Sequence, residues 1–270
     1  MLAIKNNIMA ANAARHLGES YDALAQSVER LSSGLRINTA KDDAAGLAVR
    51  ESMRADIAVL QQGARNAQDA ISMLQTTEGA MQTIDDLLVR MKQLAEQAAT
   101  GTYSSSQRAI MDNELDELAN EIERIAGSAE FNGISLLNSA TGSVSIVFGD
   151  PSDTISIDMA DMTKSGLSVD SINIGTAASA QTALTTLSTA INTATTSRAG
   201  FGAKMNRLEN TVGVLNVQVE NLLAAESRVS DVDVATEMAT MTRSQVLAQA
   251  GVAMLAQANA MPQMALTLLR

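Results

Sequence analysis

The side chains best suited to catalysis or metal binding are too few in this chain to form a site. The 270 residues include one His, His16, and no Cys. A Ser-His-Asp arrangement requires a His beside its nucleophile, and a zinc site takes its ligands largely from His and Cys. Carboxylates such as Asp85-Asp86 are adjacent in the sequence, so on a helix they point to different faces. The sequence therefore predicts no enzyme, no metal and no cofactor.

Two other patterns have structural explanations. Gly200-Phe201-Gly202 follows no predicted strand, unlike the glycines of phosphate-binding loops, so we interpret these glycines as points of close helix approach. The chain also has 15 Met. We interpret them as flexible apolar filler between helices rather than as metal ligands.

Long apolar stripes at both ends of the chain predict helices that pair with other helices. Apolar residues recur at alternating spacings of three and four, and a sustained period of 3.5 requires a partner helix. One stripe covers Leu184–Val229, with charges only at Arg198 and Glu226, and another covers Met53–Leu74. The simplest partner is the opposite end of the same chain. We therefore predict a mainly α fold, a long antiparallel helical bundle or coiled coil.

Breaks in these patterns give the expected helix boundaries. Five helices are expected, over about residues 4–35, 42–100, 107–126, 179–229 and 234–257. Asp42 or Asp43 is the expected N-cap of the second helix, and Ser106 that of the third. Gly127 is expected to end the third helix, and the fifth is expected to end near Pro262.

The segment between the third and fourth helices has a different pattern. Apolar and polar residues alternate over 144–148 and again over 155–159, and the composition of 149–153 is typical of a turn, which predicts a small β-hairpin. Three domains follow. They are a discontinuous terminal coiled-coil domain with its connector (1–41 and 230–270), a discontinuous inner helical bundle (42–138 and 178–229), and a variable surface segment with the hairpin (139–177).

Charge and hydropathy narrow the range of partners. The formal net charge is −11, and residues 78–161 account for it with 15 acidic and 4 basic side chains. Nucleic-acid binding requires a cationic surface, so no nucleic acid is expected. No segment approaches the roughly 20 apolar residues of a membrane span, and residues 1–12 lack the apolar region of a secretory signal. We expect no membrane partner and no conventional secretion.

The stripes at the two ends are too narrow to offset the conformational entropy lost on ordering isolated helices. We therefore predict that both ends are largely disordered in a free monomer and fold against each other within an assembly. The predicted polymerisation contacts are Ile4, Ile8, Leu17, Leu24, Val28, Leu31, Val234, Met238, Met241, Val252 and Leu255.

Several local motifs resemble those of bacterial flagellins. They are Leu31–Asn38 (LSSGLRIN), Lys41–Ala48 (KDDAAGLA), Asn120–Ala126 (NEIERIA), Phe131–Gly133 (FNG), Ala235–Met238 (ATEM), Leu255–Asn259 (LAQAN) and the tail from Pro262 to Arg270. The resemblance covers roughly residues 1–140 and 180–270. Only about 40–50 residues separate the two matched parts, so the chain resembles a short flagellin without large outer domains.

This resemblance implies a structural subunit of the bacterial flagellar filament, an extracellular homopolymer used in motility. It implies export of the unfolded chain through the flagellar type III apparatus, with a cytoplasmic chaperone on about Asp231–Arg270. Further implied partners are the filament cap protein and the hook–filament junction protein. A hook–filament junction protein of similar architecture is the alternative identity, although the tail from Pro262 favours flagellin.

The resemblance also implies a ligand of the host Toll-like receptor that senses flagellin. The residues that match the recognised surface of the family are Leu88, Arg90, Leu94, Ala95, Gln97 and Glu114. Val89 departs from the Gln commonly found at its position. The alternative is that Arg90 and Glu114 are solvated residues that serve subunit packing.

Overall fold

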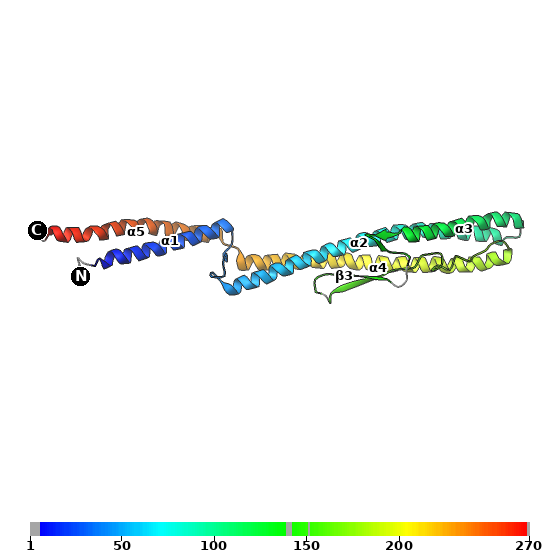
Figure 1. Ribbon diagram of the computed structural model, residues 1–270, viewed down its shortest axis with the longest axis horizontal. Coiled ribbons are helices and arrows are strands. Elements are labelled where there is room, and N and C mark those ends of the chain that lie inside the picture. Colours follow the sequence, from blue (N-terminus) through cyan, green and yellow to red (C-terminus); the bar gives the residue numbers. More distant parts are fainter. Residues whose placement is uncertain (1–5, 139–141, 151, 269–270) are drawn as a thin grey trace. The chain divides into compact units, whose positions relative to one another are not determined.

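The computed structural model describes residues 6–138, 142–150 and 152–268, and this part of the chain is mainly helical, as the apolar stripes predict (Figure 1). The helices are α1 (Ile8–Ser33), α2 (Ala44–Ala99), α3 (Ser105–Ser128), α4 (Ala177–Ser230) and α5 (Val234–Leu268). The strands are β1 (Glu130–Phe131), β2 (Ile134–Ser135), β3 (Ser143–Val147) and β4 (Thr154–Asp158). The predicted fold class is confirmed.

The chain divides into two compact units. The terminal unit comprises residues 1–57 and 220–270, and the bundle unit comprises residues 58–219. α1, α5 and the connector between α1 and α2 belong to the terminal unit. α3, all four strands and most of α2 and α4 belong to the bundle unit.

Two predicted boundaries of α3 are wrong by one or two residues. Its N-cap is Ser104 rather than Ser106, because Ser104 and Gln107 form a reciprocal capping box. The helix also continues past Gly127 to Ser128. Asp43 accepts the N–H of Gly46 at 2.9 Å, as expected of the residue that caps α2.

The predicted end of α5 is wrong by a larger number of residues. Instead of ending near Pro262, this helix continues to Leu268. A proline inside a helix removes one N–H donor and its ring crowds the carbonyl four residues earlier. The helix can continue where another group bonds that carbonyl.

The predicted β-hairpin is present as β3 and β4, which pair antiparallel with Val144 opposite Ile157 and Ile146 opposite Ile155. Ile155 and Ile157 are buried. Phe148, at the end of β3, is also buried and lies against Gly63 of α2. A Cβ on Gly63 would lie 2.4 Å from the Phe148 carbonyl oxygen, so this contact requires glycine.

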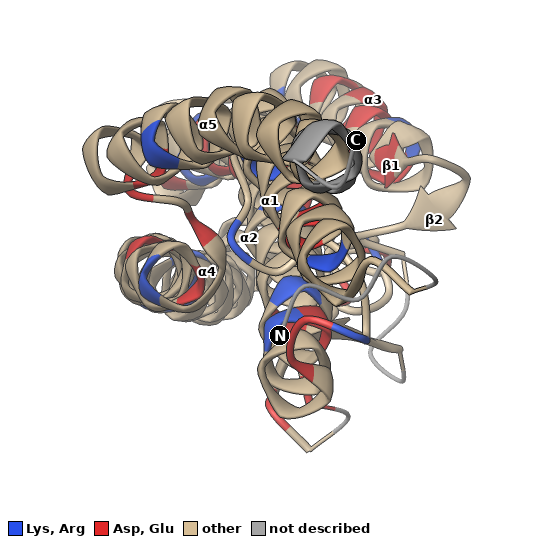
Figure 2. Ribbon diagram, turned by 90° about the vertical axis from the view of Figure 1, so that its left-hand side faces the viewer, with Lys and Arg blue, Asp and Glu red and all other residues tan. Residues whose placement is uncertain are grey.

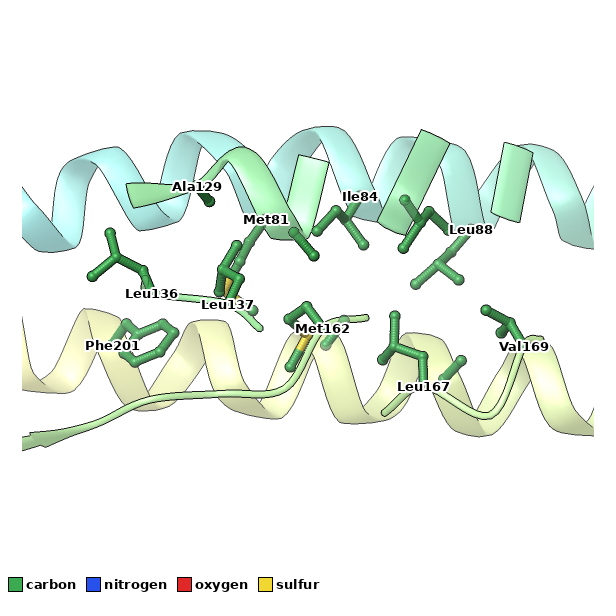
Figure 3. Packing of buried hydrophobic residues seen from close by; sticks show 14 of the residues in the cluster. Met81, Ile84, Leu88, Ala129, Leu136, Leu137, Met162, Leu167, Val169 and Phe201 are labelled. Atoms are coloured by element: carbon green, nitrogen blue, oxygen red, sulfur yellow. The ribbon is translucent and has the colours of Figure 1, made fainter. Parts of the chain in front are cut away.

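The core of the bundle unit lies between α2, α3 and α4, with β4 and the loops after β2 and β4 closing it (Figure 3). In the close-up, Met81 of α2 lies beside Leu137, and Leu88 lies nearer to Leu167 and Val169. Buried methionines fill irregular spaces in this core, as their composition suggested. The apolar stripes of α2 and α4 therefore supply a core within one chain.

The two charges that interrupt the stripe of α4 each have a partner on α2. Arg198 pairs with Glu78 and, at 2.5 Å, with Asp85 in the bundle unit. These hydrogen bonds raise the pKa of Arg198, so its positive charge is retained. Glu226 lies 3.7 Å from Arg54 in the terminal unit. Both interruptions are thus cross-helix ion pairs.

Part of the acidic excess lies on solvent-facing parts of α3. Glu114, Asp116, Glu117 and Glu123 are all exposed, and Figure 2 shows red segments along this helix. The buried face of α3 instead carries Met111, Leu115, Ala119, Ile122 and Ala126.

Candidate functional site

The candidate site is the helix pair of the terminal unit, in which α1 and α5 run side by side (Figure 1). We call the less exposed residues at heptad spacing along this pair the terminal seam. Its α1 members are Ala10, Ala13, Leu17, Ser20, Leu24, Ser27 and Leu31, and its α5 members are Glu237, Met241, Ser244, Ala248, Gly251, Leu255 and Ala258. Eight of these fourteen are Ala, Ser or Gly, and such small side chains allow two helices to approach closely.

Leu17 and Gly251 are in contact midway along the terminal seam. A Cβ on Gly251 would lie 3.1 Å from Leu17 Cδ1 and 3.5 Å from Leu17 Cβ. The absence of a side chain on α5 thus makes room for a Leu of α1. Gly251 lies inside a helix, where glycine is unfavourable by up to about 1 kcal/mol relative to Ala, so packing is the physical reason for it.

An ion pair joins the last turn of α1 to the first turn of α5. Arg30 Nη1 lies 3.7 Å from Glu237 Oε2, and both side chains are largely shielded from solvent. Arg30 sits at the negative end of its helix dipole and Glu237 at the positive end of its own. Each charge therefore interacts favourably with its helix as well as with its partner.

The connector after α1 is bonded to the segment between α4 and α5. Gly34 ends α1 with a left-handed φ of 73°, a conformation that glycine adopts without strain. Leu35 and Asp231 form an antiparallel bridge. The Arg36 N–H donates to the Ser230 carbonyl at 2.6 Å, and the Val232 N–H donates to the Gly34 carbonyl at 3.0 Å.

A buried isoleucine fastens the same connector to α2. Ile37 is buried, and its carbonyl accepts a 2.8 Å hydrogen bond from Arg50 Nη1. A Cβ on Gly46 would lie 2.6 Å from Ile37 Cδ1, so Gly46 makes room for this side chain. Arg50 also pairs with Glu51 at 2.8 Å.

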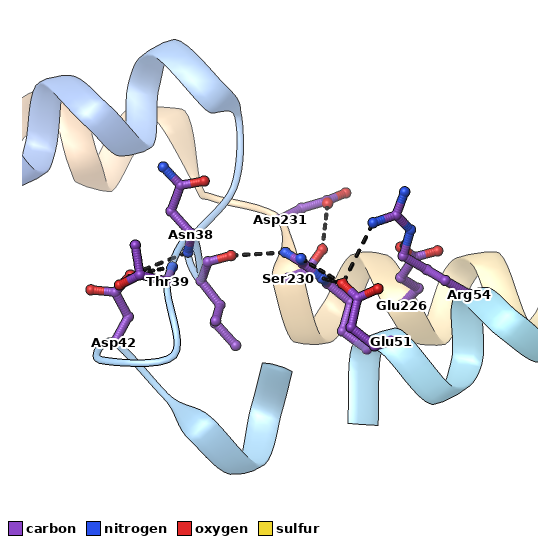
Figure 4. A network of polar contacts seen from close by, with 10 residues as sticks. Asn38, Thr39, Asp42, Glu51, Arg54, Glu226, Ser230 and Asp231 are labelled. Atoms are coloured by element: carbon purple, nitrogen blue, oxygen red, sulfur yellow. Dashed lines mark hydrogen bonds and ion pairs between the residues drawn. The ribbon is translucent and has the colours of Figure 1, made fainter. Parts of the chain in front are cut away.

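Asp42 organises the turn that leads into α2 (Figure 4). Its Oδ2 accepts the N–H of Thr39 at 2.9 Å, the Thr39 hydroxyl at 3.0 Å and the N–H of Asn38 at 3.2 Å. These donors, led by the backbone N–H of Thr39, lower the pKa of Asp42. The carboxylate form is the one that holds the turn.

The predicted polymerisation contacts divide into two groups. Leu17, Leu24, Leu31, Met241 and Leu255 lie in the terminal seam. Ile8, Val28, Val234, Met238 and Val252 face outward, with between 44% and 65% of their surface exposed. Ile4 lies outside the described residues. Of the ten described members of the predicted set, five thus lie within the chain and five on its surface.

Sequence reasoning missed several outward-facing apolar residues. They are Met9 on α1 and Val246, Leu247 and Met254 on α5. Apolar residues surround α5 instead of forming one stripe. This distribution of apolar residues around α5 could have indicated the outward-facing ones from the sequence. A stripe could not, because it identifies only one face of a helix.

The residues matched to the receptor surface lie in the bundle unit and are not all accessible. Arg90 pairs with Glu114 through two hydrogen bonds, at 3.0 and 2.7 Å, and both side chains are exposed. Gln97 is exposed and donates to the Tyr103 hydroxyl at 2.7 Å. Leu88 and Leu94 are 0% and 2% exposed. Ala95 is 0% exposed as well, so these three residues fill the core beneath the exposed pair, and a receptor role for them stays a prediction.

The described ranges contain neither a cluster of metal ligands nor a helix suited to a membrane. Within residues 6–138, 142–150 and 152–268, no three His, Cys, Asp or Glu side chains gather as metal ligands would. None of the described helices combines the length and the apolar character that crossing a membrane requires.

Comparison with known proteins places the chain in a family. Residues 4–141 match the bacterial flagellin N-terminal helical region, and residues 184–269 match the bacterial flagellin C-terminal helical region. The flagellin of Halalkalibacterium halodurans is 43% identical over 274 residues, which cover 99% of each chain. The flagellar filament 33 kDa core protein of Treponema phagedenis is 42% identical over 284 residues, again covering 99% of each.

A solved structure agrees with these matches. The crystal structure of Bacillus cereus flagellin is 39% identical, with a TM-score of 0.51, and covers 60% of this chain and 94% of that one. The relatives match along the full length of the chain, without large outer domains, as expected of a short flagellin. The chain belongs to the bacterial flagellin family and is a structural subunit of the flagellar filament.

Proposed function

We propose that the outward-facing apolar residues of α1 and α5 are the contacts through which copies of this chain polymerise. The apolar outer face of α5 carries the proposal. Large apolar side chains occur on the sides of α5 that face away from α1, and such exposed side chains favour a position covered by another helix. Other copies of the terminal unit provide the remaining cover. Head-to-tail contacts of this kind generate an open helical filament.

The experiment replaces two outward residues of α5, Val246 and Val252, by Gln and follows polymerisation of purified monomer by sedimentation and negative-stain microscopy. The double variant is expected to remain a helical monomer without filaments. Val89→Gln is the control, because Val89 is similarly exposed but lies in the bundle unit. Normal filaments from the double variant would overturn the proposal.

We further propose that the terminal unit is disordered before assembly and that the chain is exported unfolded through the flagellar type III apparatus. Two helices joined by small side chains have little apolar surface with which to offset their ordering entropy. Residues 231–270 carry the exposed apolar side chains of α5, which suit an export chaperone. The cap protein and the hook–filament junction protein complete the proposed partners.

Amide hydrogen exchange on dilute monomer tests this step. Rapid exchange is expected over 8–33 and 234–257, with protection in the buried part of α2. Firm protection of both terminal helices in the monomer would contradict it. Binding of the chaperone to a 231–270 peptide, compared with a 105–128 peptide as control, tests the export partner.

A second proposed function is activation of the host Toll-like receptor that senses flagellin. The favouring observation is the exposed Arg90–Glu114 ion pair, with Gln97 also exposed on α2. The Arg90 guanidinium and the Glu114 carboxylate join α2 to α3, and both groups can form further hydrogen bonds to a partner protein. Leu88 and Leu94 would act by holding α2 in place, since neither is accessible.

Arg90→Ala is expected to lower receptor signalling at least several-fold in reporter cells. Arg124→Ala is the matched control, because Arg124 is also exposed and paired with a carboxylate, that of Glu121. An unchanged dose–response for Arg90→Ala would remove the proposed receptor site.

A further inference from the structure

Asn7, the residue before α1, is hydrogen-bonded to both terminal helices. Its Oδ1 accepts the N–H of Ala10 at 3.1 Å, which caps α1. Its Nδ2 donates to the carbonyl of Ala258 in α5 at 2.8 Å. These two partners of one amide are thus contributed by helices at opposite ends of the sequence, since Asn7 and Ala258 are 251 positions apart.

The Ala258 carbonyl is available because of Pro262. In an α-helix, the carbonyl of each residue accepts the N–H of the residue four positions later. For Ala258 that residue is Pro262, which has no N–H. The proline thus leaves one acceptor without its usual donor inside a helix that continues to Leu268. The amide of Asn7 supplies the missing donor.

We propose that Asn7 is a positioning residue that sets the register between α1 and α5 by bonding the carbonyl that Pro262 leaves free. Such a device adds to the register preference of Leu17 and Gly251. Most other positions of the terminal seam carry small side chains, which distinguish poorly between registers one heptad apart. A shift of seven residues would set Asn7 opposite Gly251, whose carbonyl has an intrahelical donor in Leu255. A single buried polar contact is a known physical means of fixing helix register.

Two other contacts agree with this register. Arg30 lies opposite Glu237, and Leu17 lies opposite Gly251. These contacts and the bond from Asn7 to Ala258 are spread along α1 from its last turn to its N-cap. Of the three, only the bond from Asn7 depends on a donor missing from the facing helix.

The register matters for assembly because it sets which outward apolar residues of α1 lie beside those of α5. This consequence rests on the proposed polymerisation contacts. The register itself depends only on the contacts within one chain.

The substitution Asn7→Asp keeps one of the two hydrogen bonds of this side chain and removes the other. Asp keeps the acceptor for the Ala10 N–H, and its charge favours a helix N-terminus. It loses the donor and places a carboxylate against the Ala258 carbonyl. A residue that merely caps α1 would tolerate this change, whereas the proposal expects the critical concentration for polymerisation to rise by about tenfold. Asn6→Asp adds the same charge one residue earlier and is expected to change it by less than about twofold.

Pro262→Ala completes the test, because the substituted alanine restores an N–H for the Ala258 carbonyl. Asn7→Asp should then have little effect, so that Pro262→Ala and the double variant polymerise at concentrations within about twofold of each other. If Asn7→Asp alone abolishes polymerisation, a double variant that behaves like Pro262→Ala supports the proposal, and a double variant that polymerises less well than Pro262→Ala overturns it. An equal effect of Asn7→Asp in the parent chain and in the Pro262→Ala variant, or no effect in the parent chain, also overturns it.

The outcomes of this pair of substitutions at Asn7 and Pro262 can be distinguished from the outcomes of the test at Val246 and Val252. If Gln at positions 246 and 252 leaves filaments intact while Asn7→Asp acts only in the parent chain and not in the Pro262→Ala variant, the outer contacts are wrong and the register role remains. If Gln at those positions abolishes filaments and Asn7→Asp acts equally in both backgrounds, the opposite holds.

Discussion

The bundle unit and the terminal unit are both built from antiparallel helices with apolar heptads, yet they bury very different side chains. In the bundle unit, Leu, Ile, Met and Phe from three helices and the intervening loops form a core largely excluded from solvent. In the terminal unit, two helices meet through Ala, Ser and Gly, and many of their large apolar side chains face outward. The first arrangement stabilises a chain alone, and the second leaves apolar surface for other copies.

The largest expected effect of this difference comes from deleting α5. Removal of Val234–Arg270 should abolish polymerisation completely, because α1 loses its partner and the outward apolar face of α5 is gone. The bundle unit should keep its helical circular dichroism and its cooperative melting. Filaments of normal appearance from this truncated chain would contradict the role of terminal pairing.

A matched pair of Leu→Ala substitutions sharpens the comparison. Leu115 of α3 is fully buried in the bundle core, so Leu115→Ala should destabilise the monomer by about 2–5 kcal/mol in denaturant unfolding. Leu24→Ala in the terminal seam should leave monomer unfolding unchanged and raise the critical concentration for polymerisation instead. If Leu24→Ala lowers monomer stability as much as Leu115→Ala does, the terminal unit is folded before assembly.

Two glycines of α2 give a smaller contrast within the bundle unit. Gly63→Ala should destabilise the monomer by roughly 1–3 kcal/mol, because the new Cβ meets the Phe148 backbone. Gly79→Ala should stabilise it by about 0.5–1 kcal/mol, since no atom lies within 4 Å of the added Cβ. Thermal melting of the two variants beside the parent chain measures both effects.

The smallest expected effect is a pH dependence of the connector. Hydrogen bonds from Thr39 and Asn38 lower the pKa of Asp42 from its ordinary 3.8. Unfolded chains therefore bind this proton more readily, so the stabilisation is fully present above about pH 4 and is lost as the pH falls through the lowered value. Filament dissociation, measured as a function of pH, should therefore change less steeply at acidic pH in Asp42→Asn than in the parent chain. If filaments of Asp42→Asn dissociate with the same pH dependence as filaments of the parent chain, other carboxyl groups cause the acid sensitivity.

The comparison also explains which parts of the fold could be predicted. A stripe with a period of 3.5 identifies a helix and its buried face when the partner presents large apolar residues, as for Leu74 and Leu187. It identified only part of the terminal seam, because α1 and α5 carry both large and small residues at heptad spacing. Leu17, Leu24 and Leu31 lie in the seam as predicted, whereas Ile8 and Val28 face outward and small residues occupy the remaining seam positions of α1.

The surroundings of single residues could not be predicted from the sequence either. Arg198 and Glu226 interrupted a stripe, and nothing in the sequence identified Glu78, Asp85 or Arg54 as their partners. Leu88 and Leu94 resembled surface residues by their position in a family motif, yet the packing of α2 against α3 and α4 buries them. Accessibility depends on neighbours far away in the sequence, which a local motif does not specify.

The sequence by itself determined the helices, the hairpin, the flagellin family and the unequal distribution of charge, because these follow from local periodicity, turn composition and motif. Tertiary structure alone decided which face of α1 meets α5, which charges pair, and how α5 continues through Pro262. Those features depend on side chains brought together from distant parts of the chain, where size and hydrogen-bonding capacity select among faces that periodicity leaves equivalent.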